Sequence, residues 1–237
     1  MAGPLPQPPK IVVFTGPGLS REAGFAPFDP AAMPPGVALE DVVTRDGFAR
    51  APERVFAFYN QRRRALQAAA PNLAHEALAA FDLSRPGEVL IVTRNIDDFH
   101  ERAGARAVIH THGELLTARC TICMKVSDWF GDLSALDDCP ICGNNGHLRP
   151  NVVWVGEDPL GLALVYPALA TCERFLSVGD GGGEPGRSFL AEARRAGVRT
   201  TEFAAAPTPV SPEFDERIHA PLGQSVPAWV KREIAGP

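Results

Sequence analysis

The 237-residue sequence lacks several features that mark common classes of protein. No apolar run approaches the roughly 20 residues that a membrane-spanning helix needs. The first ten residues, MAGPLPQPPK, contain no apolar core of a signal peptide. Positive charge is not in excess, because the net charge is −5, and the sequence contains no internal repeat. We therefore expect a cytoplasmic protein that has no membrane segment and binds no nucleic acid sequence-specifically.

Cysteine is scarce, but the few cysteines are grouped. Four of the five form the pattern Cys-x2-Cys-x15-Cys-x2-Cys, made by Cys120, Cys123, Cys139 and Cys142. This spacing is typical of a zinc ribbon, in which four thiolates close a tetrahedral structural site. A redox or disulfide role is the alternative, and it suits a reducing compartment less well. The pattern predicts one structural zinc ion.

Short apolar runs recur along the rest of the chain, whose hydrophobic content of 45% is enough for a substantial core. Runs of this kind predict buried strands at 11–14, 89–92, 107–109, 175–178 and 198–203. Between the first two, residues 51–83 have a helical pattern that Pro71 divides into two helices. A last helix is expected over 227–234. Strands that alternate with helices indicate an α/β fold with a parallel sheet.

Polar residues follow the first two predicted strands, where open α/β sheets bind ligands. Gly16, Pro17, Gly18 and Ser20 follow the first strand. Glycines there allow backbone amides to approach a phosphate, although from these residues alone a simple structural turn is the favoured explanation. The segment Arg94-Asn95-Ile96-Asp97 follows the second strand, where its polar side chains either contact a small molecule or cap the next helix.

His112 is the candidate for chemistry. It follows the predicted strand 107–109 and precedes Gly113, close to the first cysteine pair. A neutral imidazole can accept a proton near pH 7, although a lone histidine is often structural. His110, two residues earlier, is expected to play a structural part.

The order of these motifs resembles that of the sirtuin family, the NAD-dependent protein-lysine deacylases. The resemblance rests on Arg94-Asn95-Ile96-Asp97, on His112-Gly113, on the cysteine pairs and on the segment 148–157. It implies a Rossmann-like doubly wound parallel sheet with a small helical and zinc-ribbon module. The NAD-binding domain would comprise 11–35, 86–116 and 150–237. The helical insert would be 36–85 and the zinc-ribbon module 117–149.

The resemblance also implies a role for each candidate residue. His112 would act as general base on a ribose hydroxyl, so that the acyl group passes to ADP-ribose and nicotinamide leaves. Residues 152–157 would form an extended segment, and the peptide that carries the acyl-lysine would lie along it at Val153, Gly156 and Glu157. NAD would be held by Gly16, Pro17, Gly18, Ser20, Arg94, Asn95, Ile96, Asp97, Gly179 and Asp180.

Tyr59 and Arg62 are three residues apart and share a helix face. From this spacing alone, a solvent-exposed basic turn of the helix is the favoured interpretation. In the resembled family, however, Tyr-x-x-Arg marks the subclass that removes succinyl, malonyl or glutaryl groups, whose free carboxylate needs a charged partner. The resemblance therefore predicts a desuccinylase or demalonylase that acts on acylated-lysine proteins, with deacetylation as a further activity.

Several positions depart from the family pattern, and one of them is Arg94, which replaces a glutamine and could partly supply the positive charge missing at position 29. Asp29 stands where the family has an arginine that holds NAD, so Arg21 or Arg45 would have to replace that charge. Asp180-Gly181 replaces two hydroxyl residues near the cofactor and would repel phosphates. Pro17 removes one backbone donor. These departures support an alternative prediction, a catalytically impaired protein that binds acyl-lysine and has an altered NAD site.

Overall fold

The computed structural model describes residues 8–25, 28, 33 and 36–235. Its larger lobe is built on a six-stranded, fully parallel sheet with the order β3-β2-β1-β7-β8-β9. The strands are β1 (Ile11–Thr15), β2 (Val89–Thr93), β3 (Val108–His110), β7 (Arg174–Val178), β8 (Arg199–Ala204) and β9 (Glu216–His219). The strands predicted from apolar runs are confirmed, and so is the doubly wound α/β fold.

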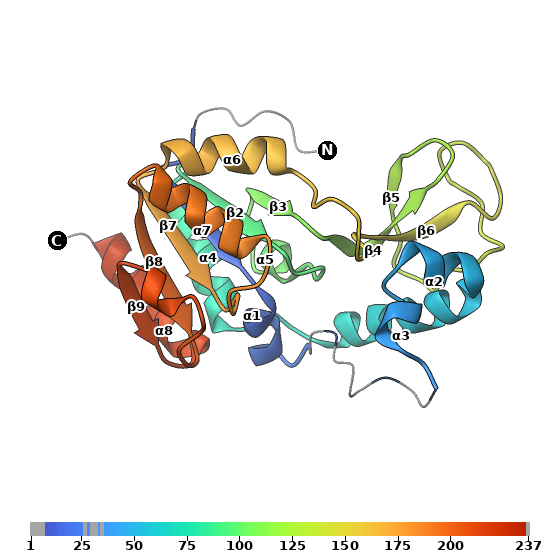
Figure 1. Cartoon of the computed structure of the whole chain (residues 1–237), viewed down its shortest axis with the longest axis horizontal. Helices are drawn as coiled ribbons and strands as arrows, with labels where there is room; N and C mark the ends of the chain where they lie inside the picture. Colours follow the sequence, from blue (N-terminus) through green and yellow to red (C-terminus); the bar gives the residue numbers. More distant parts are fainter. Residues whose placement is uncertain (1–7, 26–27, 29–32, 34–35, 236–237) are drawn as a thin grey trace.

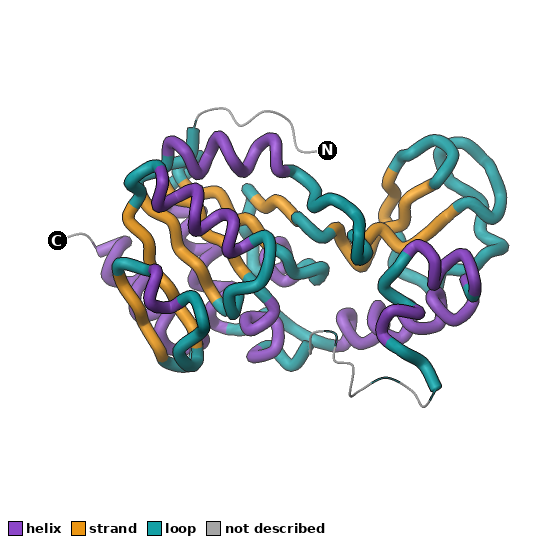
Figure 2. Tube along the Cα trace, in the orientation of Figure 1, coloured by secondary structure: helices purple, strands orange, loops and turns teal. Residues whose placement is uncertain are grey.

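Helices cover both faces of this sheet (Figures 1 and 2). Val12 and Phe14 of β1 face one side, and Ile11 and Val13 face the other, because successive strand residues alternate. The first side packs against α6 (Leu162–Thr171) and α7 (Gly186–Arg195). The second packs against α4 (Leu73–Ser84) and α8 (Leu222–Ala235). Burial on both faces explains why these strands are apolar runs rather than alternating patterns.

The smaller lobe combines an antiparallel sheet with helices (Figure 1). Its sheet has the order β5-β4-β6, with β4 (Gly113–Cys120), β5 (Val126–Asp128) and β6 (Leu148–Val152). Its helical elements are η2 (Leu39–Asp41), α2 (Arg45–Arg50) and α3 (Pro52–Ala68). The Asn60 side chain of α3 makes two 2.9 Å hydrogen bonds to the backbone of Leu133. The zinc-ribbon segment is thereby fixed to α3.

The chain passes between the two lobes in four connections. These are 23–38, only partly described, and 69–72, 111–112 and 153–161. In the second, Asn72 caps α4 by accepting hydrogen bonds from the amides of Ala74 and His75. The predicted division at Pro71 is confirmed. The predicted domain limits stay a prediction, although α4, inside the predicted insert 36–85, packs on the large sheet.

Two elements differ from the sequence prediction. The last helix, α8, begins five residues early, because the Glu22 carboxylate accepts hydrogen bonds from the amides of Leu222 and Gly223 at 2.9 and 3.0 Å. The extended segment expected over 152–157 ends with β6 at Val152, because Glu157 closes a turn onto Trp154. Among the described residues, no helix is long and apolar enough to span a membrane.

Candidate active site

A cavity of about 260 Å³ lies where the two lobes meet, close to the lower end of the range of about 300–1,000 Å³ for ligand pockets. It lies beyond the carboxyl ends of β1, β2 and β3, beside the point where the strand order reverses between β1 and β7. Of the predicted site residues, those that line it are Pro17, Ser20, Arg62, Arg94, Asn95, Ile96, Asp97, His112 and Val153. The other predicted site residues do not line it; they are Gly16, Gly18, Tyr59, Gly156, Glu157, Gly179 and Asp180.

The glycine loop after β1 packs directly on the loop after β7. A Cβ atom on Gly16 would lie 2.3 Å from the Cα of Asp180, and one on Gly18 would lie 2.7 Å from the Gly179 carbonyl. The amides of Gly16 and Gly18 donate to the carbonyls of Val178 and Gly179 at 3.0 and 2.8 Å. These glycines therefore permit loop-to-loop packing, and their two amides are engaged there instead of pointing at an open phosphate site.

The loop after β2 is tied to the glycine loop by side chains. Asn95 Nδ2 donates to the Gly16 carbonyl at 3.0 Å, and the Ser20 hydroxyl donates to Asp97 Oδ2 at 2.7 Å. Asp97 also accepts from the Phe99 amide at 3.3 Å, at the start of α5 (Phe99–Arg102). Burial raises the pKa of the Asp97 carboxyl. Asp97 thus lines the cavity and also accepts from the first amide of α5, while its contact with a ligand stays a prediction.

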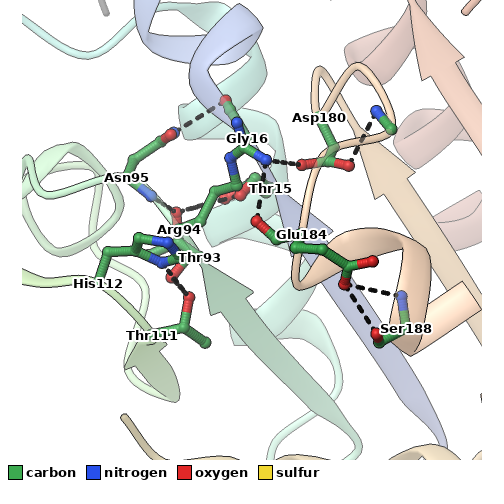
Figure 3. A network of polar contacts seen from close by, with 11 residues as sticks. Thr15, Gly16, Thr93, Arg94, Asn95, Thr111, His112, Asp180, Glu184 and Ser188 are labelled. Atoms are coloured by element: carbon green, nitrogen blue, oxygen red, sulfur yellow. Dashed lines mark hydrogen bonds and ion pairs between the residues drawn. The ribbon is translucent and has the colours of Figure 1, made fainter. Parts of the chain in front are cut away.

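His112 lies in the connection between β3 and β4 and faces the cavity. Its Nδ1 lies 3.0 Å from the Thr111 hydroxyl (Figure 3). Burial, followed by the positive charge of Arg94, lowers the pKa of His112 to about 4. The imidazole is therefore neutral at pH 7 and able to accept a proton. His110 instead bonds to Glu101 and to the Asn95 carbonyl, as expected of a structural residue.

Arg94 and Asp180 form an ion pair of 3.2 Å between the loops after β2 and β7 (Figure 3). Arg94 also donates to the Glu184 carbonyl at 3.2 Å. Burial raises the pKa of Asp180 to about 6, and the charge of Arg94 limits that rise. The expected repulsion between Asp180 and a phosphate is thus offset by a paired cation, which the sequence alone did not connect to it.

Arg62 enters the cavity from α3, between two aromatic rings. Its guanidinium carbon lies 4.6 Å from the ring centres of both Phe25 and Phe28, which also line the cavity. Burial lowers the pKa of Arg62, and Tyr59 and Asp97 oppose that shift. The Tyr59 side chain is fully buried, and its hydroxyl accepts a 3.0 Å hydrogen bond from Trp154 Nε1.

Glu157 holds the segment that follows β6. It accepts two hydrogen bonds from Arg149, at 2.7 and 3.1 Å, one from Arg45 at 2.7 Å, and one from the Trp154 amide at 2.8 Å. Although burial alone would raise it, these donors lower the pKa of Glu157 to about 2. Arg45, one of two candidates for the missing cation, is therefore engaged with Glu157. Asp29 itself lies outside the described residues.

The four paired cysteines converge in the smaller lobe. Their sulfur atoms all lie within 4.8 Å of one another, which fits the tetrahedral shell of a structural zinc ion. Cys120 Sγ accepts from the Ile122 amide at 3.4 Å, and Cys142 Sγ from Asn144 Nδ2 at 3.3 Å, as thiolate ligands commonly do. With four sulfur ligands no position remains for water, so zinc here has a structural role.

Some residues at the site were not found from the sequence. Phe25, Phe28, Val152 and Glu184 line the cavity, and Thr111 contacts His112. Thr111 and Glu184 each follow a predicted strand, at the same edge of the sheet as the residues that were found, and that position was the available signal. The two phenylalanines carry no such signal, because an aromatic residue after a short helix is ordinary core material.

The fold and the site together define a Rossmann-type, dinucleotide-dependent enzyme with an accessory zinc module. Residues 16–182 match the model of the Sir2 family, and the chain belongs to that family. The NAD-dependent protein deacylase of Escherichia coli (strain K12) is 43% identical over 232 residues, which span 96% of this chain and 83% of that protein. The NAD-dependent protein deacylase of Yersinia pseudotuberculosis is 42% identical over 227 residues, 94% of this chain and 82% of that protein.

Solved structures of similar proteins agree. A Sir2 homologue in complex with NAD superposes with a TM-score of 0.84 at 29% identity, covering 95% of this chain and 89% of that one. A mutant Sir2 homologue in complex with ADP-ribose gives a TM-score of 0.82 at 30% identity, covering 95% and 91%. The chain is thus an NAD-dependent protein deacylase, with NAD as cofactor and a cysteine cluster suited to zinc.

Proposed function

We propose that this chain removes acidic acyl groups, such as succinyl and malonyl, from lysine side chains of cytoplasmic proteins. The acyl group passes to ADP-ribose and nicotinamide is released. The observation that carries this preference is the Arg62 guanidinium, which lines the same cavity as His112. An acyl-lysine that reaches the cavity would present its free carboxylate to that guanidinium.

The surroundings of Arg62 favour a carboxylate partner. Two aromatic rings lie 4.6 Å from the guanidinium carbon and shield part of it from water, and charge-assisted hydrogen bonds are stronger where less water is present. The Tyr59 hydroxyl accepts from Trp154, so its own proton is left to donate. Within the described residues, that hydroxyl donates to no other side chain. Arg62, which lines the cavity, would supply the charged donors for that carboxylate, and Tyr59 is proposed as the neutral donor although its hydroxyl is buried outside the cavity lining.

His112 is proposed as the general base, because it is neutral at pH 7 and faces the cavity. NAD, when bound, supplies the ribose hydroxyl and the leaving nicotinamide. Asn95 and Asp97 would receive the nicotinamide carboxamide, while Ser20 and Arg94 would lie along the remaining cofactor. Val153, Gly156 and Glu157 would hold the peptide, with Glu157 fixing that segment through Arg149.

The test compares succinyl-lysine and acetyl-lysine peptides, with NAD present and nicotinamide release as the readout. Arg62→Met should lower kcat/KM for the succinyl peptide roughly 10- to 100-fold, the value of a charged hydrogen bond of about 1.5–3 kcal/mol. Activity on the acetyl peptide should change much less. Arg64→Met is the matched control, because Arg64 lies on the same helix and pairs with Asp132 at the surface. Equal loss on both peptides would contradict the carboxylate role.

A catalytically impaired acyl-lysine binding protein is the second candidate. It is favoured by the engaged amides of Gly16 and Gly18, by Pro17, which has no amide donor, and by Glu184 at the cavity wall. The Arg94–Asp180 ion pair weighs against it, because it removes one uncompensated negative charge. Binding of the succinyl peptide without any nicotinamide release would support this candidate and overturn the enzymatic proposal.

A further inference from the structure

The Thr111 hydroxyl lies between the His112 ring and the backbone of β2. Its oxygen is 3.0 Å from His112 Nδ1 and 3.0 Å from the carbonyl oxygen of Thr93 (Figure 3). Thr111 is fully buried, and its own amide donates to the same carbonyl at 2.8 Å. Thr93 ends a strand that is paired on both sides, with β1 and with β3. The hydroxyl is therefore anchored to a strand that is hydrogen-bonded on both sides.

The numbers of hydrogen-bond donors and acceptors at Thr111, Thr93 and His112 decide where the protons lie. A threonine hydroxyl has one proton to donate, and a carbonyl oxygen can only accept. If that proton pointed at His112 Nδ1, the oxygens of Thr111 and Thr93 would face each other 3.0 Å apart with no proton between them. If the proton points at Thr93, the hydroxyl oxygen is free to accept, and His112 Nδ1 must carry a proton to complete the contact. The second arrangement satisfies all three groups.

We propose that Thr111 is a positioning residue that keeps neutral His112 in the tautomer protonated at Nδ1, so that the lone pair of Nε2 is available as the base. The inference rests on the proposed role of His112 as base. Nε2 makes no hydrogen bond within the described residues, and His112 lines the cavity.

The same contact serves the charged form of the ring. A proton accepted at Nε2 makes an imidazolium, in which Nδ1–H continues to donate to the Thr111 oxygen. The Thr111 hydroxyl keeps its proton, which continues to donate to the Thr93 carbonyl, so no group on the buried side has to rotate during the transfer. Without the hydroxyl, the ring could carry its proton on Nε2 instead, and a ring in that state cannot act as base from the cavity side.

The tautomer can be read directly by ¹⁵N NMR of histidine-labelled full-length protein at pH 7, where His112 is neutral, with His112→Asn identifying its signals. Wild type should show a proton-bearing Nδ1 and an unprotonated Nε2. Thr111→Val should move both shifts toward an averaged tautomer, whereas Thr111→Ser, which keeps the hydroxyl, should match wild type. A protonated Nε2 in wild type, or an unchanged spectrum in Thr111→Val, would overturn the proposal.

Kinetics give a second readout, with the succinyl-lysine peptide and NAD. In Thr111→Val, kcat should fall roughly 10-fold with KM nearly unchanged, since a factor of ten corresponds to about 1.4 kcal/mol, the scale of one hydrogen bond. Thr111→Ser should recover most of the loss, and failure to recover would count against the hydroxyl. If wild type releases no nicotinamide, the proposed function fails, while the NMR result still decides the tautomer.

Discussion

Arg94 is in contact with more of the site than any sequence pattern suggested. It pairs with Asp180, donates to the Glu184 carbonyl and acts on His112 through its charge. The sequence placed arginine where the family has glutamine, and aspartate where it has a hydroxyl residue, as two separate departures. In the structure they form one ion pair, which explains why both charges are tolerated beside a cofactor site.

The pH dependence of activity should follow from this contact. Burial lowers the pKa of His112 to about 4, and Arg94 adds to that effect. Arg94→Gln removes a positive charge, which favours the protonated ring and raises the pKa of His112. His112 would then become protonated at a higher pH as the solution is acidified. The acidic limb of the kcat/KM profile should therefore move to higher pH. Arg64→Gln serves as control, and an unmoved limb would refute the coupling.

The positions of single side chains at the cavity and the cysteine cluster were predictable from the sequence, whereas the contacts between side chains were not. His112, Asn95, Asp97 and the paired cysteines were identified because each residue type has a chemical use at its position. The partners of Glu157 were not, because Arg45 lies far away in the chain. Glu157 was expected at the peptide, yet its carboxylate is already occupied by two arginines.

At the scale of elements, the pairing of β4 with β6 requires glycine at the first residue of β4, Gly113. Gly113 has a φ of +78°, and an added Cβ would lie 2.1 Å from the Asn151 carbonyl of the neighbouring strand β6. The pattern His112-Gly113 was noticed for its histidine, but the glycine is required by the geometry of the strand pair. It lets β4 start immediately after the residue that faces the cavity.

Gly113→Ala should therefore be costly. The left-handed φ costs about 1–2 kcal/mol, and the clash with a backbone atom adds about 1–3 kcal/mol. Gly104→Ala is the matched control, since Gly104 has a φ of +101° but no atom within 4 Å of an added Cβ. Urea unfolding should show a clearly larger loss of unfolding free energy for Gly113→Ala. Equal losses would mean that β6 moves aside without cost.

Element boundaries show where sequence reading fails. The buried strands of the large sheet were predicted because apolar runs and turn residues mark them locally. The start of α8 was missed because its cap, Glu22, comes from the opposite end of the chain. The end of β6 was missed because a side-chain turn at Glu157 replaces the strand pattern. In both cases a contact distant in sequence decides the boundary.

For the molecule as a whole, the zinc site and the cavity are linked through α3. Cys120 and Cys139 belong to the same buried cluster as Phe56, and Arg62 lies further along that helix. Stripping the metal with a chelator should release one zinc per chain, lower the melting temperature and abolish preference for the succinyl peptide. Zinc added back should restore all three. Full activity in metal-free protein would show that the two regions are independent.

The sequence predicted the two-part organisation but not the way the parts are joined. The cysteine spacing predicts the zinc-ribbon segment, and the apolar runs predict the strands of the large sheet. Nothing local indicates that α4 belongs with the large sheet while α3 belongs with the small one. That division depends on which apolar face each helix buries, and the face is decided by packing partners from elsewhere in the chain.

The four connections between the lobes have one more consequence. His112 and Val153 lie in two of them and line the cavity, so a molecule bound there would resist rotation of one lobe against the other. Thermodynamic coupling of this kind is reciprocal. Any substitution that loosens a connection, such as loss of the Arg149–Glu157 pair, would weaken ligand affinity without touching the ligand. Ligand affinity would thus depend on the residues that hold the four connections in place as well as on the residues that line the cavity.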